Sequence, residues 1–354
     1  MLSISSKFHS YTVEPAQSLD EVITGRCPPG QTFILVDRNV QQLYPSAFSD
    51  GVATNRIFSI EATEEQKSYE QLTPLFTQLL ETGFRKDCIL LVIGGGVLQD
   101  IGCFIASVLF RGVRWELVPT TLLAQCDSCI GSKSSINIGA FKNQIGTFYP
   151  PHRIHMISDI LQTLPPDEIR SGLGEIIKLF IVAGGAAFDG LAQRLDDFED
   201  PGVLQELIHE SLRIKKRYIE QDELDKGVRN LLNYGHTFGH AYESATNYAI
   251  PHGIAVTLGI ATATYFSEQL GMVENGSYRA MVRMLYPFFA PYHEHLLAAE
   301  PERILKAMKL DKKNTGSVIN CILTEGPGAL KKVPLSLDEQ VAPMMSGFLA
   351  NLST

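Results

Sequence analysis

The first half of this chain alternates short apolar segments with amphipathic ones, and this alternation restricts the folds that it can adopt. Residues 32–36, 88–93 and 115–119 are short apolar runs typical of buried strands. Between them, residues 64–83 and 97–110 repeat apolar side chains at helical spacing. Strands that alternate with helices predict an α/β domain with a parallel sheet and helices on both of its faces.

The pattern changes near residue 165, where two prolines precede two acidic residues. Pro165-Pro166-Asp167-Glu168 is a plausible helix start, and apolar residues recur at helical spacing through most of 167–310. A length of 354 residues also suggests about two domains. We therefore predict an α/β domain over residues 1–163 and a mostly α-helical domain over residues 164–354.

Composition excludes several classes of function. The formal net charge of −9 argues against a general nucleic-acid binder, which is usually basic. The chain has neither a signal-peptide pattern nor an apolar run of the roughly 18 residues that a bilayer span needs. Its six cysteines are scattered, and the lone Cys126-x-x-Cys129 pair is weak evidence for a redox or zinc site. We expect a cytoplasmic protein with no membrane partner.

Three of the nine histidines fall within seventeen residues, at His236, His240 and His252. His236 and His240 are four residues apart and share one face if the segment is helical. Glu175 is a carboxylate within an apolar run upstream. One carboxylate and two histidines with an open position form a common catalytic zinc set. A metal or an anion site is therefore predicted, but spacing does not say which histidines would be ligands, and buried structural histidines remain the alternative.

Glycine and lysine positions suggest an anionic ligand. Gly94-Gly95-Gly96 lies between a predicted strand and a predicted helix, where glycine lets the backbone approach a pyrophosphate. The spacing is not G-x-G-x-x-G, so a glycine turn without a ligand explains it equally well. Lys133, Lys142 and Lys178 lie among glycine, asparagine and histidine residues. A substrate with anionic groups fits these cations, whereas a solvated surface would explain any one of them.

Several motifs together identify a family. They are residues 94–100, Phe110-Arg111-Gly112-Val113, residues 118–125, 142–149, 170–178 and 229–240. Across about residues 30–330 the chain resembles the 3-dehydroquinate synthase family of sugar phosphate cyclases. The resemblance implies a dehydroquinate synthase-like fold, with a Rossmann-like NAD-binding domain and a helical metal- and substrate-binding domain. It also implies a homodimer.

The same resemblance implies NAD and a divalent metal, Zn²⁺ or Co²⁺. It makes Glu175, His236 and His252 the metal ligands and places His240 on the phosphate side. The implied NAD contacts are Asp37, Asn39, Glu64, Lys67, Gly95, Gly96, Val97, Asp100, Thr120, Thr121, Asp127, Ser128, Lys142 and Thr163.

The implied reaction converts 3-deoxy-D-arabino-heptulosonate 7-phosphate into 3-dehydroquinate and phosphate. It would proceed by transient oxidation, phosphate elimination, reduction and intramolecular aldol closure. The implied catalytic set is Lys133, Lys178, Lys215, Asp225, Arg229, Asn233 and His240, with Arg111, Asn143, Lys312 and Lys313 also binding substrate. The resemblance gives the substrate carboxylate to Lys215, Arg229 and one of the two adjacent lysines, and it allows Arg111 to come from the partner subunit.

Three departures from the usual family pattern leave the substrate open. Ser132 and Ser135 stand where glycines are usual, Gln99 replaces a glycine, and Asp225 replaces a glutamate. A cyclase of secondary metabolism, such as a 2-deoxy-scyllo-inosose or valiolone-type synthase, is therefore an alternative. A metal-dependent alcohol dehydrogenase of the glycerol dehydrogenase type and a non-catalytic homologue are the less favoured alternatives.

Overall fold

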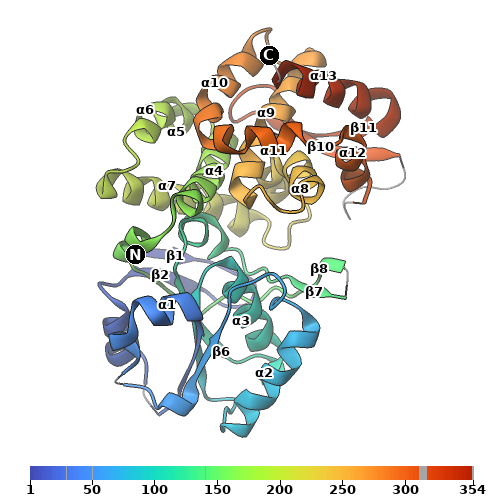
Figure 1. Cartoon of the computed structure of the whole chain (residues 1–354). Helices are drawn as coiled ribbons and strands as arrows, with labels where there is room; N and C mark the ends of the chain where they lie inside the picture. Colours follow the sequence, from blue (N-terminus) through green and yellow to red (C-terminus); the bar gives the residue numbers. More distant parts are fainter. Residues whose placement is uncertain (29, 50, 140, 311–316, 353–354) are drawn as a thin grey trace. The chain divides into compact units, whose positions relative to one another are not determined.

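A computed structural model describes the chain except for residues 29, 50, 140, 311–316 and 353–354 (Figure 1). The described chain divides into two compact units. The first contains residues 1–164 and 215–225, and the second contains residues 165–214 and 226–354. The second half of the chain thus returns one short segment to the first unit.

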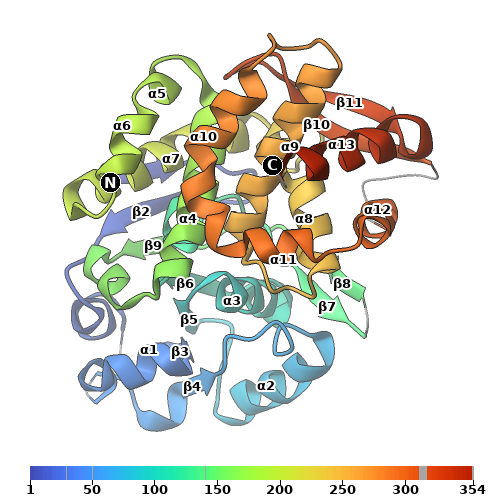
Figure 2. The same ribbon diagram turned by 45° about the horizontal axis from the view of Figure 1, so that its top comes forward.

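The first unit is built on a seven-stranded sheet with the order β1-β2-β9-β6-β5-β3-β4. Figure 2 shows the labels of its last six strands in this sequence. Only the β1–β2 pair is antiparallel. Its strands are β1 (Leu2–Ile4), β2 (Tyr11–Pro15), β3 (Thr32–Asp37), β4 (Ile57–Ile60), β5 (Ile89–Gly94), β6 (Arg114–Pro119) and β9 (Arg153–Met156).

The central strands owe their place in the sheet to continuous apolar sequence. Every residue of β5 is buried, as is typical of a parallel strand that is covered on both faces. Helix α3 (Gly96–Val108) packs on this strand, where Gly102 lies so close that an added Cβ would be 2.3 Å from Val92. The other helices are α1 (Arg38–Leu43) and α2 (Tyr69–Glu81). A small hairpin of β7 (Ile136–Ile138) and β8 (Phe141–Ile145) completes the unit.

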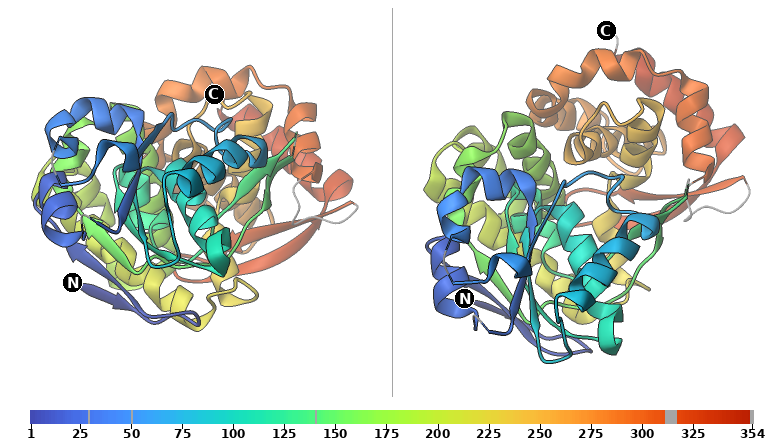
Figure 3. Two further views of the ribbon diagram at one scale, coloured as in Figure 1. Left: turned by 90° about the horizontal axis from the view of Figure 1, so that it is seen from below. Right: turned by 60° about the horizontal axis from the view of Figure 1, so that its bottom comes forward.

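The second unit is mainly helical and carries one hairpin, β10 (Val318–Thr324) with β11 (Leu330–Ser336). Its long central helix α9 packs against α4, α8 and α10. The helices of this unit are coloured from green to red in Figure 3. The helices are α4 (Pro166–Ala183), α5 (Gly185–Asp189), α6 (Leu191–Asp196), α7 (Pro201–Gln221), α8 (His236–Ala245), α9 (His252–Gln269), α10 (Ser277–Phe289), α11 (His293–Leu297), α12 (Pro301–Leu310) and α13 (Ala342–Leu352). Residues 215–221 of α7 belong to the first unit.

Helix α9 is buried on all sides, which explains why it is apolar around its whole circumference. All residues from Gly253 to Ser267 are buried. A helix with apolar residues on every face belongs in the core of a helical domain, where neighbours surround it. His252, the first residue of α9, is thereby held at the end of a fully buried helix.

The predicted fold class is confirmed. The predicted strands correspond to β3, β5 and β6, and the predicted helix start at Pro165-Pro166 is the start of α4, with proline at its first position. The long amphipathic segment 64–83 is helical only from Tyr69 to Glu81. Among the described residues, none of the helices has the length and apolarity needed to cross a membrane.

Candidate functional site

Glu175, His236 and His252 converge in the second unit, although they come from three different helices. The Glu175 Oε1 atom lies 3.5 Å from His236 Nε2 and 3.1 Å from His252 Nε2. The other carboxylate oxygen of Glu175 accepts a hydrogen bond from Lys178, one turn later on α4. Both members of that ion pair are almost fully buried. Because isolated buried charges are unstable, this carboxylate requires the surrounding cationic groups.

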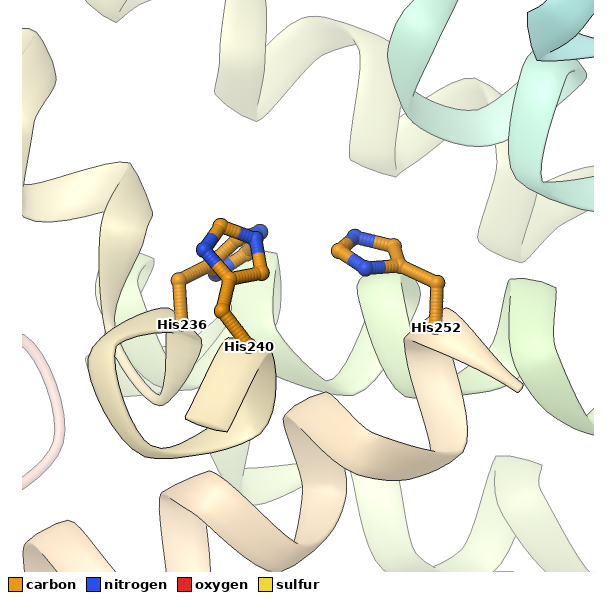
Figure 4. A group of neighbouring side chains, drawn as sticks. All are labelled: His236, His240 and His252. Atoms are coloured by element: carbon orange, nitrogen blue, oxygen red, sulfur yellow. The ribbon is translucent and has the colours of Figure 1, made fainter. Parts of the chain in front are cut away.

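His240 belongs to the same group of side chains. His236 and His240 project from α8, and His252 faces them from the start of α9 (Figure 4). One ring nitrogen from each of the three histidines lies within 4.8 Å of the others. His240, predicted to bind the phosphate, therefore lies beside the predicted metal ligands. This position is compatible with a role as a phosphate-binding residue and with a role as a third imidazole ligand of the metal.

The distances within this cluster fit a divalent metal. Zinc ligands lie about 2.0–2.2 Å from the ion, so two ligands of a tetrahedral site are roughly 3.3–3.5 Å apart. The two separations from Glu175 Oε1 to the imidazole nitrogens, 3.5 and 3.1 Å, are close to that spacing. One carboxylate and two or three imidazoles are also a donor set that zinc and cobalt accept.

The electrostatics of the cluster favour a positive charge. Burial alone would lower the pKa of His252. Its contacts with Glu175 and Glu243 outweigh burial and raise the pKa to about 10. In the metal-free chain the two carboxylates therefore hold a proton on this imidazole. A cation bound at the same place would gain the same stabilisation and replace that proton.

Glycines allow the three helices to approach closely enough to form the cluster. An added Cβ at Gly253 would lie 1.8 Å from the Ser171 carbonyl oxygen, and one at Gly174 would lie 2.1 Å from the Gly253 carbonyl oxygen. Gly253 also donates its backbone N–H to Ser171 Oγ at 3.0 Å. These contacts join α4 and α9 at the residues next to Glu175 and His252. An added Cβ at Gly259 would lie 1.9 Å from the Gly235 carbonyl oxygen, so α8 and α9 meet equally closely beside His236.

Arg229 and Asn233 precede the histidine cluster in a 3-10 turn, Val228–Asn233. Arg229 is buried, and Asn233 donates its side-chain amide to the Asn230 carbonyl at 3.1 Å. A buried guanidinium needs an anion or acceptors around it. Lys312 and Lys313, the other predicted carboxylate ligands, lie outside the described residues.

In the first unit, the predicted NAD contacts begin at the carboxyl ends of three neighbouring strands. Asp37 ends β3 and accepts the backbone N–H of Asn39 at 3.0 Å. After β5, Gly95 caps α3, and an added Cβ there would lie 2.8 Å from Thr121. Thr120 donates its backbone N–H to Gly94 at 3.1 Å. Gly96 and Val97 form the first turn of α3, so backbone amides and strand ends meet where such sheets bind ligands.

A polar network continues from this edge of the first unit. Lys67 Nζ lies 3.2 Å from Asp100 and 3.3 Å from Glu64. Ser135 donates its hydroxyl to Asp100 at 2.9 Å, and Asn137 donates its amide to Glu64 at 2.9 Å. Burial raises the pKa of Asp100, while Lys67 and Ser135 oppose that shift. Three predicted NAD contacts, Glu64, Lys67 and Asp100, are thus one connected group.

The loop after β6 holds two further ion pairs. Lys133 donates to Asp225 at 2.5 Å, and Lys215 forms an ion pair with Asp127 and also donates to the Asp127 carbonyl at 2.8 Å. Asp225 and Lys215 belong to the segment that returns to this unit from the second half of the chain. The sequence offered no signal for these pairs, because their members are about ninety residues apart.

Each of the substituted glycine positions makes a specific contact through its new side chain. Ser132 donates its hydroxyl to Glu223 at 2.7 Å, and Ser135 contacts Asp100 as described above. Gln99 donates to the Ser128 carbonyl at 2.5 Å and accepts the Ser128 hydroxyl at 2.8 Å. The departures therefore strengthen contacts within the first unit.

The remaining predicted residues lie on exposed segments of the first unit. Arg111 follows α3 in a left-handed backbone conformation, with a φ of 61°. Lys142 and Asn143 are on β8, where Asn143 donates its backbone N–H to the Asn137 side chain at 2.8 Å. Thr163 ends a 3-10 turn and donates its hydroxyl to the Ile160 carbonyl at 3.0 Å.

The cysteines form neither disulfides nor a second metal site within the described residues. All six are free and buried. Burial raises the pKa of Cys129 to about 12, which keeps it a thiol and a weak nucleophile. The Cys126-x-x-Cys129 spacing thus reflects core packing.

Comparisons with known proteins agree with this arrangement. A family model of the 3-dehydroquinate synthase N-terminal domain matches residues 57–171, and one of the C-terminal domain matches residues 172–314. A 3-dehydroquinate synthase from Alkaliphilus oremlandii (strain OhILAs) is 35% identical over 330 residues, covering 91% of this chain and 90% of the relative.

Two solved structures share the fold at lower identity. One is a 2-deoxy-scyllo-inosose synthase complexed with carbaglucose-6-phosphate, NAD⁺ and Co²⁺, with a TM-score of 0.86 at 20% identity. It covers 97% of this chain and 98% of that one. The other is a 2-epi-5-epi-valiolone synthase from Streptomyces hygroscopicus subsp. jinggangensis 5008 with NAD⁺ and Zn²⁺ bound, with a TM-score of 0.82 at 23% identity. The match covers 99% of this chain and 98% of that one.

Proposed function

Because this chain belongs to the 3-dehydroquinate synthase family, we propose that it converts 3-deoxy-D-arabino-heptulosonate 7-phosphate into 3-dehydroquinate and phosphate. The observation that carries this proposal is the 35% identity to a 3-dehydroquinate synthase over 91% of the chain. The cyclases with other products that share the fold are 20% and 23% identical. The proposed enzyme is a phosphate-eliminating carbon–oxygen lyase that depends on NAD and a divalent metal.

The protein groups have distinct proposed roles at the metal. Glu175, His236 and His252 would hold Zn²⁺ or Co²⁺, in keeping with the fit of their spacing. When bound, the metal supplies Lewis acidity toward an alcohol oxygen, and NAD supplies reversible hydride transfer. Lys178 donates a hydrogen bond to the second oxygen of Glu175 and so orients the carboxylate. His240 lies beside this group and is proposed to meet the leaving phosphate.

The cations of both units suit a substrate with two anionic groups. We assign the phosphate to Arg111, Lys133, Asn143, Lys178, Asn233 and His240, since ammonium, guanidinium, imidazole and amide groups all stabilise a departing phosphate. The substrate carboxylate is assigned to Arg229, Lys215 and one of Lys312 and Lys313. Burial of Arg229 supports this assignment, because a guanidinium out of water binds a carboxylate strongly and with defined geometry.

The NAD site is proposed at the carboxyl ends of β3, β5 and β6. Glycine at positions 95 and 96 allows close approach of a pyrophosphate to the start of α3. The network of Lys67, Asp100 and Glu64 would hold the loop beside the nucleotide. Lys215 forms an ion pair with Asp127. A substrate carboxylate bound by Lys215 would therefore share its ammonium group with Asp127.

We also propose a homodimer in the cytoplasm. The six free, buried cysteines suit a reducing compartment. Arg111 lies in an exposed loop held by consecutive left-handed residues, from which it would act on the substrate of a partner subunit. Light scattering would test the dimer, and mixed dimers of an Arg111→Ala variant and a metal-ligand variant would recover partial activity if Arg111 acts across subunits.

Incubation with the heptulosonate phosphate, NAD and Zn²⁺ or Co²⁺ tests the main proposal. Release of phosphate together with 3-dehydroquinate, without net NADH, is the expected outcome. Turnover of glucose 6-phosphate or sedoheptulose 7-phosphate instead would assign the chain to another cyclase activity. Net NADH production from a simple alcohol would show a dehydrogenase.

An Arg229→Ala variant separates the carboxylate assignment from the metal. We expect a large rise in KM for the heptulosonate phosphate with metal content unchanged. Equal loss of metal would show that Arg229 supports the metal cluster instead of the substrate.

A further inference from the structure

A carboxylate that the sequence motifs did not single out contacts the metal-binding cluster from outside. Glu243 lies on α8, seven residues after His236 and three after His240, so all three side chains share one helix face. Its Oε1 and Oε2 atoms lie 3.3 and 3.4 Å from His252 Nδ1. Its side chain is largely buried, with 13% exposed.

This contact determines which nitrogen of His252 is available to a metal. An ionised carboxylate only accepts hydrogen bonds, so the His252 Nδ1 atom carries a hydrogen and donates it in a hydrogen bond to Glu243. The opposite nitrogen, Nε2, faces Glu175 Oε1 at 3.1 Å. In a neutral imidazole this nitrogen then has the lone pair that a metal requires.

We propose that Glu243 is a positioning residue that orients His252 for metal binding by fixing its tautomer and the direction of its ring. The inference rests on the metal site of the proposed function and adds a group that does not itself bind the metal. His236 has a comparable partner, because its Nδ1 atom lies 3.3 Å from the Tyr234 carbonyl. Glu243 differs in that it would also bring a negative charge close to a bound cation. Partners of this kind raise the basicity of a histidine ligand.

The alternative role for Glu243 is to join α8 to the start of α9 without any influence on the metal. A Glu243→Gln variant distinguishes the two roles, because the amide retains its shape and an acceptor oxygen but loses the charge. Glu268→Gln is the matched control. Glu268 is another glutamate of the second unit, and it accepts the backbone N–H groups of Gly276 and Tyr278 at 3.0 and 2.8 Å.

The experiment measures Co²⁺ affinity of the full chain by competition with a chromophoric chelator, with the visible Co²⁺ spectrum and the melting temperature of the metal-free protein alongside. We expect Glu243→Gln to weaken Co²⁺ binding about 10- to 100-fold and to change the Co²⁺ bands. Glu268→Gln should bind Co²⁺ as the wild type does, even if it melts earlier. Glu243→Asp, which retains the charge at a greater distance, should be intermediate.

Three results would overturn the inference, and they differ in what else they affect. Wild-type Co²⁺ affinity and spectrum in Glu243→Gln would show that Glu243 is only structural, with the proposed function untouched. Failure of the wild-type chain itself to bind Co²⁺ would remove the metal site and the inference together. If Glu243→Gln lowers the melting temperature, equal losses of Co²⁺ affinity in Glu268→Gln would also contradict a specific role.

Discussion

The metal cluster of the second unit and the loop site of the first unit are held in different ways. Glu175, His236 and His252 are fixed by three helices that meet at glycine contacts. Lys133 and Asp225 lie instead on loop segments, and 44% of the Lys133 side chain is exposed, compared with 2% for Glu175. Packed helices thus position the metal cluster, whereas loops position the Lys133–Asp225 pair.

This difference bears on how a sugar phosphate cyclase can keep its chemistry while its substrate varies. Helices that pack through glycine have little freedom to move, so the metal ligands are preorganised. Loops tolerate substitution, because their contacts are made by individual side chains. Ser132, Ser135 and Asp225 lie on loops of the first unit, whereas Gln99 lies on α3, and none of the four is a metal ligand. We infer that helix packing in the second unit preserves the proposed metal site, whereas the first unit accepts the departures.

The largest effect is expected when the metal cluster loses its carboxylate. Glu175→Gln removes the charge that the two imidazoles and Lys178 surround, so bound metal should fall below one equivalent. Phosphate release should fall by on the order of a thousandfold, because Lewis-acid stabilisation contributes several kcal/mol. Metal analysis and a phosphate-release assay measure both. Glu168→Gln, in the first turn of the same helix, is the control, and equal activity of the two variants would contradict a metal-dependent reaction.

A smaller but still severe effect is expected from Gly253→Ala, which tests whether glycine contacts hold the cluster. The added methyl group would lie 1.8 Å from the Ser171 carbonyl oxygen, so α4 and α9 must separate. Overpacking of this kind costs about 2–3 kcal/mol. We expect an earlier calorimetric transition and weaker Co²⁺ binding. Gly190→Ala is the control in the same unit, because its new Cβ would make only ordinary contacts, the nearest at 3.7 Å. Intact Co²⁺ affinity in Gly253→Ala would show that this packing does not set the ligand geometry.

The two sites also differ in how much of them the sequence reveals. Strand ends are visible as apolar runs that stop at Asp37, at Gly94 and at Pro119, so this edge of the sheet could be located from local pattern, whereas the NAD contacts proposed there came from the family resemblance. The histidine cluster could be predicted because two of its members are one helical turn apart. The ambiguity of the His236–His240 pair arose for the same reason, since helical spacing places both at the cluster without choosing between them.

Contacts between distant segments could not be predicted in this way. Glu243 carries a usable signal, as it continues the face of His236 and His240, but its partner His252 begins another helix. The Lys133–Asp225 and Lys215–Asp127 pairs depend on a segment that returns to the first unit after about fifty residues. Such pairs follow from packing of the whole chain, whereas periodicity reports only what lies within one element.

A moderate effect is expected from Ser132, which tests whether side chains hold the loop site. Ser132 has a φ of 67°, a strained value for a residue other than glycine, and its hydroxyl donates to the buried Glu223. Ser132→Ala keeps the strain and removes the bond, so it should destabilise the protein by about 1–2 kcal/mol. Ser132→Gly removes the backbone strain as well as the hydrogen bond, so it should destabilise the protein less than Ser132→Ala does.

Urea unfolding of both variants, with KM for the phosphorylated substrate, measures this effect. We expect KM to rise several-fold in Ser132→Ala, since Lys133 is the next residue, while metal content stays at the wild-type level. Equal stability of Ser132→Ala and the wild type would mean that the Glu223 contact does not hold the loop.

The smallest effect concerns the pH dependence of stability. The pKa values of two histidines, one in each unit, are shifted in opposite directions. Carboxylates raise the pKa of His252 to about 10, whereas burial, with the nearby His9 and Arg114, lowers the pKa of His152 in the first unit to about 4. The ring of His152 stacks on that of His9, with centroids 4.0 Å apart. Because unfolded histidine binds a proton near pH 6.5, the unfolded chain takes up more protons than the folded one between pH 6.5 and 4. Stability should therefore fall as the pH drops through this window.

His152→Gln removes this contribution, so its melting temperature should depend less steeply on pH between 6.5 and 4 than that of the wild type. Because His152 is only partly buried, solvent screening should keep the difference to a few degrees at most. Melting curves of the metal-free protein at several pH values measure it, with exposed His295→Gln as the control. Parallel curves for the wild type and His152→Gln would show that the stacked pair does not resist protonation. A flatter curve would locate the acid sensitivity in the first unit, away from the carboxylate-rich cluster of the second.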